Sequence, residues 1–267
     1  MADPKEYKKT DQFTAQQKFL QTCSDDFLKH SRERKTINIL WIGCSSTNKD
    51  DTPPRTPSTH HILEQILWLA KSIDPTIQVN TKTIILEDLN FDHCEWNYSV
   101  QWHYCTRPCW ISQRKAQKWI ADPLTQLYND ITDWADIVLI ASPIRRGNAS
   151  SLYYKLVERC NCIENQKEVY GVDLIHNKLM WAIVIWAQDG VQHVLWSIMT
   201  TRSQMGFAFA KQPFVWYTAW WYLNDRIDLV PTQLKEENEI IMEIAKEMLE
   251  NQFTTIKARR VLDEKIV

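Results

Sequence analysis

The residues best suited to chemistry lie at positions 136–160, where an apolar run is followed by a polar loop and then by a helical pattern. The apolar run at 137–141 is too short for a buried helix and predicts a central strand, ended by the proline and glycine that follow. The loop is rich in small hydrogen-bonding side chains, and Asn148 or Ser150 can cap the next helix. We therefore expect a polar or anionic ligand to meet the helix N-terminus here, at the carboxyl end of the strand.

Further strands and helices must position this loop. Strand patterns occur at 37–42, 78–86 and 178–187, with a weaker one at 207–215. Helices are predicted at 60–72, 122–133 and 191–205, and after the loop as far as Cys160. A last helix at 236–251 has an apolar stripe made of Ile240, Ile241, Ile244, Met248 and Leu249. The alternation of strands and helices predicts an α/β fold with a doubly wound parallel sheet.

The loop and its helix resemble a flavin-contacting segment of the NAD(P)H-dependent FMN reductases, which are flavodoxin-like proteins. That family carries S/T-P-x-x-x-G-x-x-S after a strand and (D/E)-R near the end of the helix. The matching residues are Ser142, Pro143, Gly147, Ser150, Glu158 and Arg159. The resemblance extends over about residues 37–223. It implies the order 2-1-3-4-5 for a five-stranded parallel sheet, to which the residue pattern adds a helical N-terminal arm and a C-terminal helix.

The domain organisation follows from the same pattern. A helical N-terminal arm is expected at 1–36, with apolar positions typical of amphipathic helices. The flavodoxin-like, FMN-binding domain is expected at 37–225, and it contains an insertion at 87–120 that is rich in aromatic residues. A helical extension is expected at 226–267.

The resemblance implies that three loops hold FMN. The first loop would bind the phosphate through Ser45, Ser46, Ser58 and Thr59, with Ser58 or Thr59 as the helix N-cap. The second loop would line the isoalloxazine ring through Ser142, Pro143, Ile144, Arg145, Arg146, Gly147, Asn148 and Ser150. The third loop would close over the flavin edge through Ala187, Gln188, Asp189 and Gly190. The residues alone leave other interpretations open: a capped Ser/Thr turn for the first loop, and solvated or NAD(P)H-binding arginines for the second.

Three cysteines of the insertion, Cys94, Cys105 and Cys109, are candidates for a metal site. The related iron-sulfur flavoproteins bind a cluster through cysteines in this insertion. The spacing C-x10-C-x3-C supplies only three ligands and lacks the compact cluster pattern. We therefore expect no iron-sulfur cluster and no other metal, with a site completed by His93 and His103 as the alternative, and we interpret the seven cysteines of the chain as reduced thiols.

Two residue types depart from ordinary composition. The chain has 5 Gly and 13 Trp, whereas average usage would give roughly 19 Gly. Some Trp occupy positions where this fold favours a small residue or a positive φ: Trp41, Trp181, Trp186, Trp196, Trp216 and Trp220. One hypothesis is that the source organism reads these codons as glycine through a reassigned UGA codon. The alternative is a naturally Trp-rich protein.

The resemblance implies an FMN-dependent NAD(P)H oxidoreductase that passes electrons to a quinone, flavin, azo compound or metal ion. The alternatives are a flavodoxin-type electron carrier and a binding or assembly module without flavin. A homodimer and a small-molecule acceptor are the expected partners. A formal net charge of −2 argues against a nucleic-acid surface, and the polar N-terminus and short apolar runs predict a cytoplasmic protein without a membrane segment.

Overall fold

The structure is a computed structural model that describes residues 18, 21, 22, 25, 35–45, 58–96, 105–186, 190–211, 213–218 and 231–266. Most of the expected N-terminal arm lies outside these residues. The arm positions that are described, Lys18, Gln21, Thr22 and Asp25, are all helical. The Thr22 hydroxyl donates to the Lys18 carbonyl oxygen at 2.9 Å.

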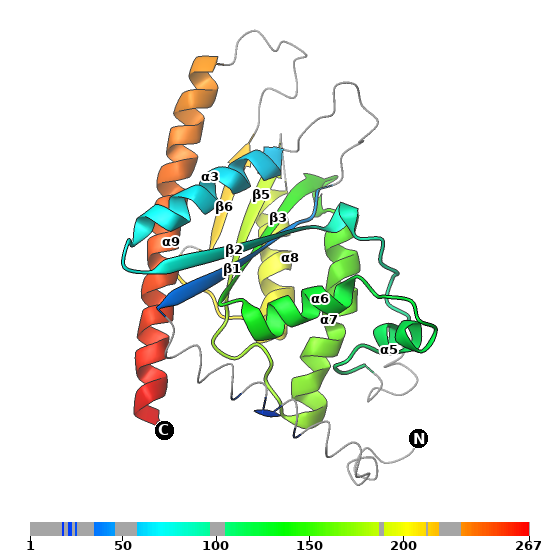
Figure 1. Cartoon of the computed structure of the whole chain (residues 1–267). Coiled ribbons are helices and arrows are strands. Elements are labelled where there is room, and N and C mark those ends of the chain that lie inside the picture. Colours follow the sequence, from blue (N-terminus) through cyan, green and yellow to red (C-terminus); the bar gives the residue numbers. More distant parts are fainter. Residues whose placement is uncertain are drawn as a thin grey trace.

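A parallel sheet forms the centre of the molecule (Figure 1). Its strands are β1 (Thr36–Gly43), β2 (Gln78–Ile85), β3 (Ile137–Arg145), β5 (Leu179–Trp186) and β6 (Phe214–Thr218). They pair in parallel in the order β2-β1-β3-β5-β6. The short strand β4 (Asn148–Ala149) pairs antiparallel with β3 and lies off this path. The parallel strands alone follow the order 2-1-3-4-5, so the predicted flavodoxin-like class is confirmed.

Helices cover both faces of the sheet. Their bounds are α3 (Ser58–Ile73), α5 (Trp110–Gln117), α6 (Leu124–Asn129), α7 (Ser151–Tyr170), α8 (Val191–Gln204) and α9 (Pro231–Ile266), with short turns η1 (Leu86–Asp88) and η3 (Asp130–Trp134). Helices α3 and α9 lie on one face, and α6, α7 and α8 lie on the other (Figure 1). Within the described part of the chain, none of the helices is both long enough and apolar enough to cross a membrane.

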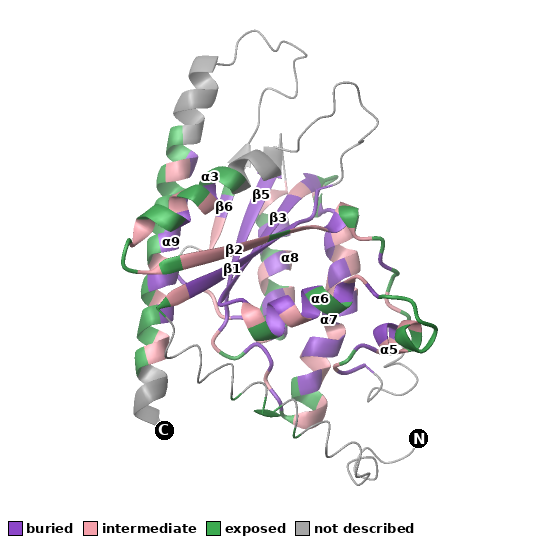
Figure 2. Cartoon of the chain, in the orientation of Figure 1, coloured by how far each residue is buried: buried purple, intermediate pink, exposed green. Residues whose placement is uncertain are grey.

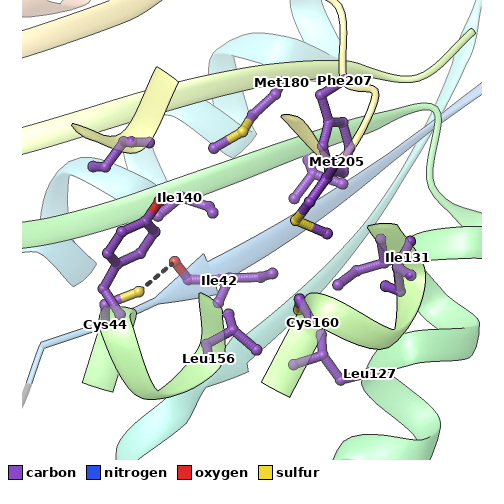
Figure 3. Packing of buried hydrophobic residues seen from close by; sticks show 14 of the residues in the cluster. Ile42, Cys44, Leu127, Ile131, Ile140, Leu156, Cys160, Met180, Met205 and Phe207 are labelled. Carbon is purple, nitrogen blue, oxygen red and sulfur yellow. Dashed lines mark hydrogen bonds between the residues drawn. The ribbon is translucent and has the colours of Figure 1, made fainter. Parts of the chain in front are cut away.

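Two hydrophobic cores lie on opposite faces of the sheet, because side chains alternate along each strand. In β1, Leu40 and Ile42 face α7 and α8, whereas Ile39 and Trp41 face α3 and α9. Figure 2 shows the resulting buried centre, in which β1, β3 and β5 are almost entirely buried. Figure 3 shows the α7 side, where Leu156 and Cys160 lie among strand residues such as Ile42.

Two predicted strand boundaries were wrong. Strand β3 does not end before Pro143 but continues to Arg145, and Pro143 pairs with Ile185 of β5. The fifth parallel strand begins at Phe214 rather than at residue 207. Before it, Ala208 makes only an isolated bridge with Leu179. Pro213 immediately precedes β6 and has no N–H group to donate to a ladder.

Two helices, α7 and α9, were predicted too short, and the single helix predicted at 122–133 is divided into α6 and the short turn η3. Helix α7 continues ten residues beyond Cys160, because no breaker occurs before Gly171, which ends the helix in the left-handed conformation at φ +71°. Helix α9 has 36 residues. Its buried side includes Ile241, Met248 and Leu249 of the predicted stripe, but Ile240 and Ile244 are exposed.

The end of α9 is fixed to the start of the sheet. Arg260 Nη2 donates to the Thr36 carbonyl oxygen at 3.0 Å and lies 3.2 Å from Asp136 Oδ1. The other carboxylate oxygen of Asp136 accepts the Asn38 amide N–H at 2.8 Å. This buried carboxylate therefore joins β1, the start of β3 and α9.

Candidate functional site

The second loop is a tight hairpin between β3 and β4. Arg145 pairs with Asn148, so Arg146 and Gly147 are the two central residues of the turn. Both have positive φ, at +52° for Arg146 and +75° for Gly147. This is the requirement of a type I′ turn, whose twist matches that of the strands it joins. The hairpin projects from the carboxyl edge of the sheet, where the sequence predicts a ligand loop.

A serine pair fixes the base of the hairpin. Ser142 is fully buried, and its Oγ accepts the Ser150 amide N–H at 3.1 Å and donates to the Pro143 carbonyl oxygen at 3.0 Å. Ser150 in turn caps α7, because its Oγ accepts the Tyr153 amide N–H at 3.2 Å. Ser150, rather than Asn148, is the N-cap. Both hydroxyls are engaged within the protein and hold the loop in place.

The second and third loops meet through two glycines. Gly190, with φ +92°, occupies the N-cap position of α8. A Cβ atom built on Gly190 would lie 2.7 Å from the Gly147 Cα and 3.1 Å from its carbonyl oxygen. No side chain fits at position 190 while the loops keep this distance. The backbones of both loops therefore form one continuous wall at the edge of the sheet.

The exposed part of this wall carries positive charge. Arg145, Arg146 and Asn148 are exposed, and Pro143 is half-buried. Neither arginine forms a salt bridge with a described carboxylate. Ile144 differs from its neighbours because its side chain is fully buried in the core on the α7 side. Only its backbone is available to line a ligand.

The first loop is described only at its two ends. The Cys44 amide N–H donates to the Ala141 carbonyl oxygen at 2.8 Å, which holds this loop beside the end of β3, and Ser45 is buried. Ser58 and Thr59 are the first two residues of α3 rather than residues that precede it. Ser46 lies outside the described residues, as do Ala187, Gln188 and Asp189 of the third loop.

An apolar groove of about 420 Å³ begins at the first turn of α8, directly after Gly190. Side chains of α8 and β6 line it: Val191, Gln192, Leu195, Trp196, Met199, Phe214 and Trp216. Trp196 and Trp216 are exposed in spite of their size. The apolar surface of this groove therefore begins where the wall formed by the two glycine loops ends.

The three cysteines of the insertion lie near one another, and a fourth that sequence reasoning missed joins them. Cys162 of α7 hydrogen-bonds through its thiol to Cys109. The signal was present in the sequence, because C-N-C at 160–162 places two cysteines on different sides of one helix. Within the described ranges, no group of three His, Cys, Asp or Glu side chains has the arrangement of a metal site.

Some tryptophans adopt conformations that this side chain disfavours. Trp41 lies inside β1 rather than in the turn after it, and Trp41 and Trp181 flank Leu139 across neighbouring strands. Both indoles are fully buried, and their N–H groups have no partner among the described residues. Trp96 and Trp119 have positive φ, at +52° and +60°. Neither Trp96 nor Trp119 is among the six positions of the glycine hypothesis, and none of those six that the structure describes has a positive φ.

No protein-family model matches the chain, and no curated protein matches its sequence. Solved structures share its fold. RosB, with bound 8-demethyl-8-formylriboflavin-5'-phosphate, is 14% identical with a TM-score of 0.60, over 85% of this chain and 81% of RosB. The azoreductase AzrA is 9% identical with a TM-score of 0.53, over 80% of this chain and 99% of AzrA. A flavone reductase is 14% identical with a TM-score of 0.50, over 81% of this chain and 63% of that chain. At these identities the likeness shows the fold.

Proposed function

We propose that this chain is an FMN-dependent oxidoreductase that takes electrons from NAD(P)H and passes them to a small organic acceptor. The observation that carries this proposal is the contact between Gly147 and Gly190. It brings two backbone loops together at the carboxyl edge of a flavodoxin-like sheet, where such folds bind ligands. RosB, which shares the fold, holds a riboflavin 5'-phosphate derivative. Azoreductase and reductase activities occur among the other structures with this fold.

The described residues fit a flat ring beside the glycine wall. Pro143, Gly147 and Asn148 present backbone and small side chains there, and Ser142 and Ser150 keep the hairpin in position. Gly190 leaves the first N–H groups of α8 without a side-chain cap, so they remain available to an electronegative ring atom. We propose that Ser45, Ser46, Ser58 and Thr59 hold the phosphate at the N-terminus of α3. When bound, FMN supplies a ring that accepts a hydride and returns electrons to an acceptor.

The two exposed arginines suggest how the electron donor is bound. Arg145 and Arg146 extend from the hairpin beside the proposed ring position, and each carries a full positive charge. A guanidinium group forms bidentate hydrogen bonds with phosphate oxygens, so these residues suit the phosphates of NAD(P)H. The apolar groove that begins at Val191 suits an aromatic acceptor, such as a quinone or azo compound, better than a metal ion. We propose that the active enzyme is a homodimer.

The test begins with a titration of the purified full chain with FMN. Binding is measured by the quenching of flavin fluorescence. Gly190→Val should lower the affinity for FMN by at least tenfold, because its side chain forces the two loops apart. Anaerobic NADH or NADPH should then bleach the flavin absorption of the unmodified protein within the time of one turnover. Bound flavin that NAD(P)H reduces only slowly would indicate an electron carrier instead.

Gly171→Val is the matched control. Gly171 also has positive φ, at +71°, but a Cβ atom there meets nothing within 4 Å. The substitution therefore imposes a similar backbone strain at the end of α7 without separating the loops. FMN affinity should be unchanged in this variant. An equal loss of FMN affinity in both variants would overturn the proposal. The absence of FMN binding by the unmodified chain would overturn it as well.

A further inference from the structure

Thiols from separate parts of the chain gather beside the middle of α7, away from the loops at its N-terminus. Cys94 follows η1, Cys105 and Cys109 precede α5, and Cys162 comes from α7. Cys109 is buried, and its side chain hydrogen-bonds to that of Cys162, which is fully buried. The Asn161 side-chain amide donates to Cys105 Sγ at 3.4 Å, and the Trp96 amide N–H donates to Cys94 Sγ at 3.4 Å.

Cys109 is surrounded by groups that stabilise a thiolate. It is the N-cap residue of α5, an eight-residue helix, and the Ile111 and Ser112 amide N–H groups lie near its sulfur. Arg159 Nη2 lies 3.9 Å from the same sulfur. The Arg159 side chain is itself fully buried, where it donates to the Asp92 carbonyl oxygen at 2.9 Å and pairs with Asp122. A buried guanidinium and a helix N-terminus both favour negative charge.

The other thiols of this group remain protonated at neutral pH. Burial raises the pKa of Cys105 to about 12 and raises the pKa of Cys94. The pKa of Cys162 is held well above its usual value, chiefly by its interaction with Cys109 and then by burial. That interaction is also the main cause that lowers the pKa of Cys109 to about 5, with further help from Arg159. Both sulfurs also lie against Arg159, Cys109 beside its guanidinium at 3.9 Å and Cys162 beside its carbonyl oxygen at 3.5 Å.

We propose that Cys109 and Cys162 are a redox-active pair that a hydroperoxide oxidises to an intramolecular disulfide. The Cys109 thiolate attacks the distal oxygen of the peroxide, and the O–O bond breaks to give a Cys109 sulfenic acid and, after protonation, water or an alcohol. The Cys162 sulfur then attacks the Cys109 sulfur. The S–S bond forms as the S–O bond breaks, and the oxygen leaves as water with the Cys162 proton.

The reaction balances as two thiols and one peroxide giving one disulfide and two molecules of water when the oxidant is hydrogen peroxide. An external dithiol returns the pair to the reduced state by exchange. This site is independent of the proposed flavin reaction, because none of its residues belongs to the three loops. Cys162 lies twelve residues after Ser150 along α7, so the same helix carries a residue of the pair and the cap of the proposed flavin loop.

The test treats the full reduced chain with hydrogen peroxide, blocks free thiols with N-ethylmaleimide and maps the digested peptides by mass spectrometry. We expect one disulfide, between the peptides that contain Cys109 and Cys162, and its loss on addition of dithiothreitol. In Cys162→Ser, dimedone should trap a sulfenic acid at Cys109. The zinc and iron contents of the untreated protein are measured in parallel.

Cys160→Ser is the matched control, because Cys160 is also fully buried on α7 but lies among Leu127, Ile131 and Met205 (Figure 3). This variant should form the disulfide within twofold of the unmodified rate, whereas Cys109→Ser should not form it. A free Cys109 after oxidation, or a disulfide between other cysteines, would overturn the proposal. One equivalent of zinc or iron released by peroxide would also overturn it, because the sulfurs would then be metal ligands.

Discussion

At Trp119 a large side chain occupies a backbone conformation suited to glycine. Its φ is +60° and its side chain is 97% exposed, so the indole gains no burial in return for the strain. A residue other than glycine in this region costs roughly 1–2 kcal/mol. Trp119→Gly should therefore raise the free energy of unfolding by about 1 kcal/mol, as measured by urea denaturation.

Trp68→Gly should have the opposite effect and lower the free energy of unfolding. Trp68 is also exposed, at 71%, but it lies inside helix α3, where glycine costs about 1 kcal/mol through lost backbone entropy. Destabilisation by both substitutions would contradict the argument from φ. The separate hypothesis, that the native protein carries glycine at positions such as 41, 181 and 186, is checked by mass spectrometry of protein from the source organism. Tryptophan at positions 41 and 186 would exclude glycine there.

At the scale of elements, α9 is also held to the residue that follows α3 by a surface ion pair. Lys257 Nζ lies 2.6 Å from Asp74 Oδ2, just after α3. The hydrogen bond from Lys257 is the main cause that lowers the pKa of Asp74 from 3.8 to about 2. Since the folded-state pKa is the lower one, the contact stabilises the fold above pH 3.8, and this stabilisation disappears as the pH falls towards 2.

The Asp74→Asn variant tests this pH dependence. Its Tm should lie below that of the unmodified protein at pH 7, and the two values should converge near pH 2. The effect is small because the pair is exposed to solvent. Glu64→Gln on α3 serves as the control, since it removes an exposed carboxylate and leaves the Lys257 contact intact. A Tm difference of the same size at pH 7 and at pH 2 would show that the contact between Lys257 and Asp74 is not its cause.

The strands and helices also show how much of the fold could be predicted from the sequence. Apolar runs predicted three of the five parallel strands to within two residues, because the sheet is buried on both faces. The end of β3 was missed because antiparallel pairing with β4, after a turn at Arg146 and Gly147, extends the strand past its proline. Cys162 was missed because its contact with Cys109 joins residues far apart in the chain. The contact between Gly147 and Gly190 likewise depends on how two loops are placed in space.

At the scale of the whole molecule, a bound cofactor should stabilise the fold. A ligand at one hundred times its Kd adds about 2.7 kcal/mol to the free energy of unfolding. For a domain of this size that raises Tm by roughly 5–10 °C. FMN should produce this shift, whereas riboflavin should produce a much smaller one if the first loop binds the phosphate. Equal shifts at equal concentrations would remove the proposed role of Ser45, Ser46, Ser58 and Thr59.

The hydrogen bond from Arg260 to the Thr36 carbonyl joins residues 224 positions apart. Ribosomes add about 5–20 residues per second, so roughly 10–45 s separate the synthesis of these two residues. Throughout that interval the apolar strand β1 has been made but the helix that covers its α9 side has not. In a nascent chain α3 can cover this face of β1 early, but the cover that α9 supplies is completed only when synthesis is almost finished. The yield of the protein in the cell should depend on chaperones that bind the growing chain.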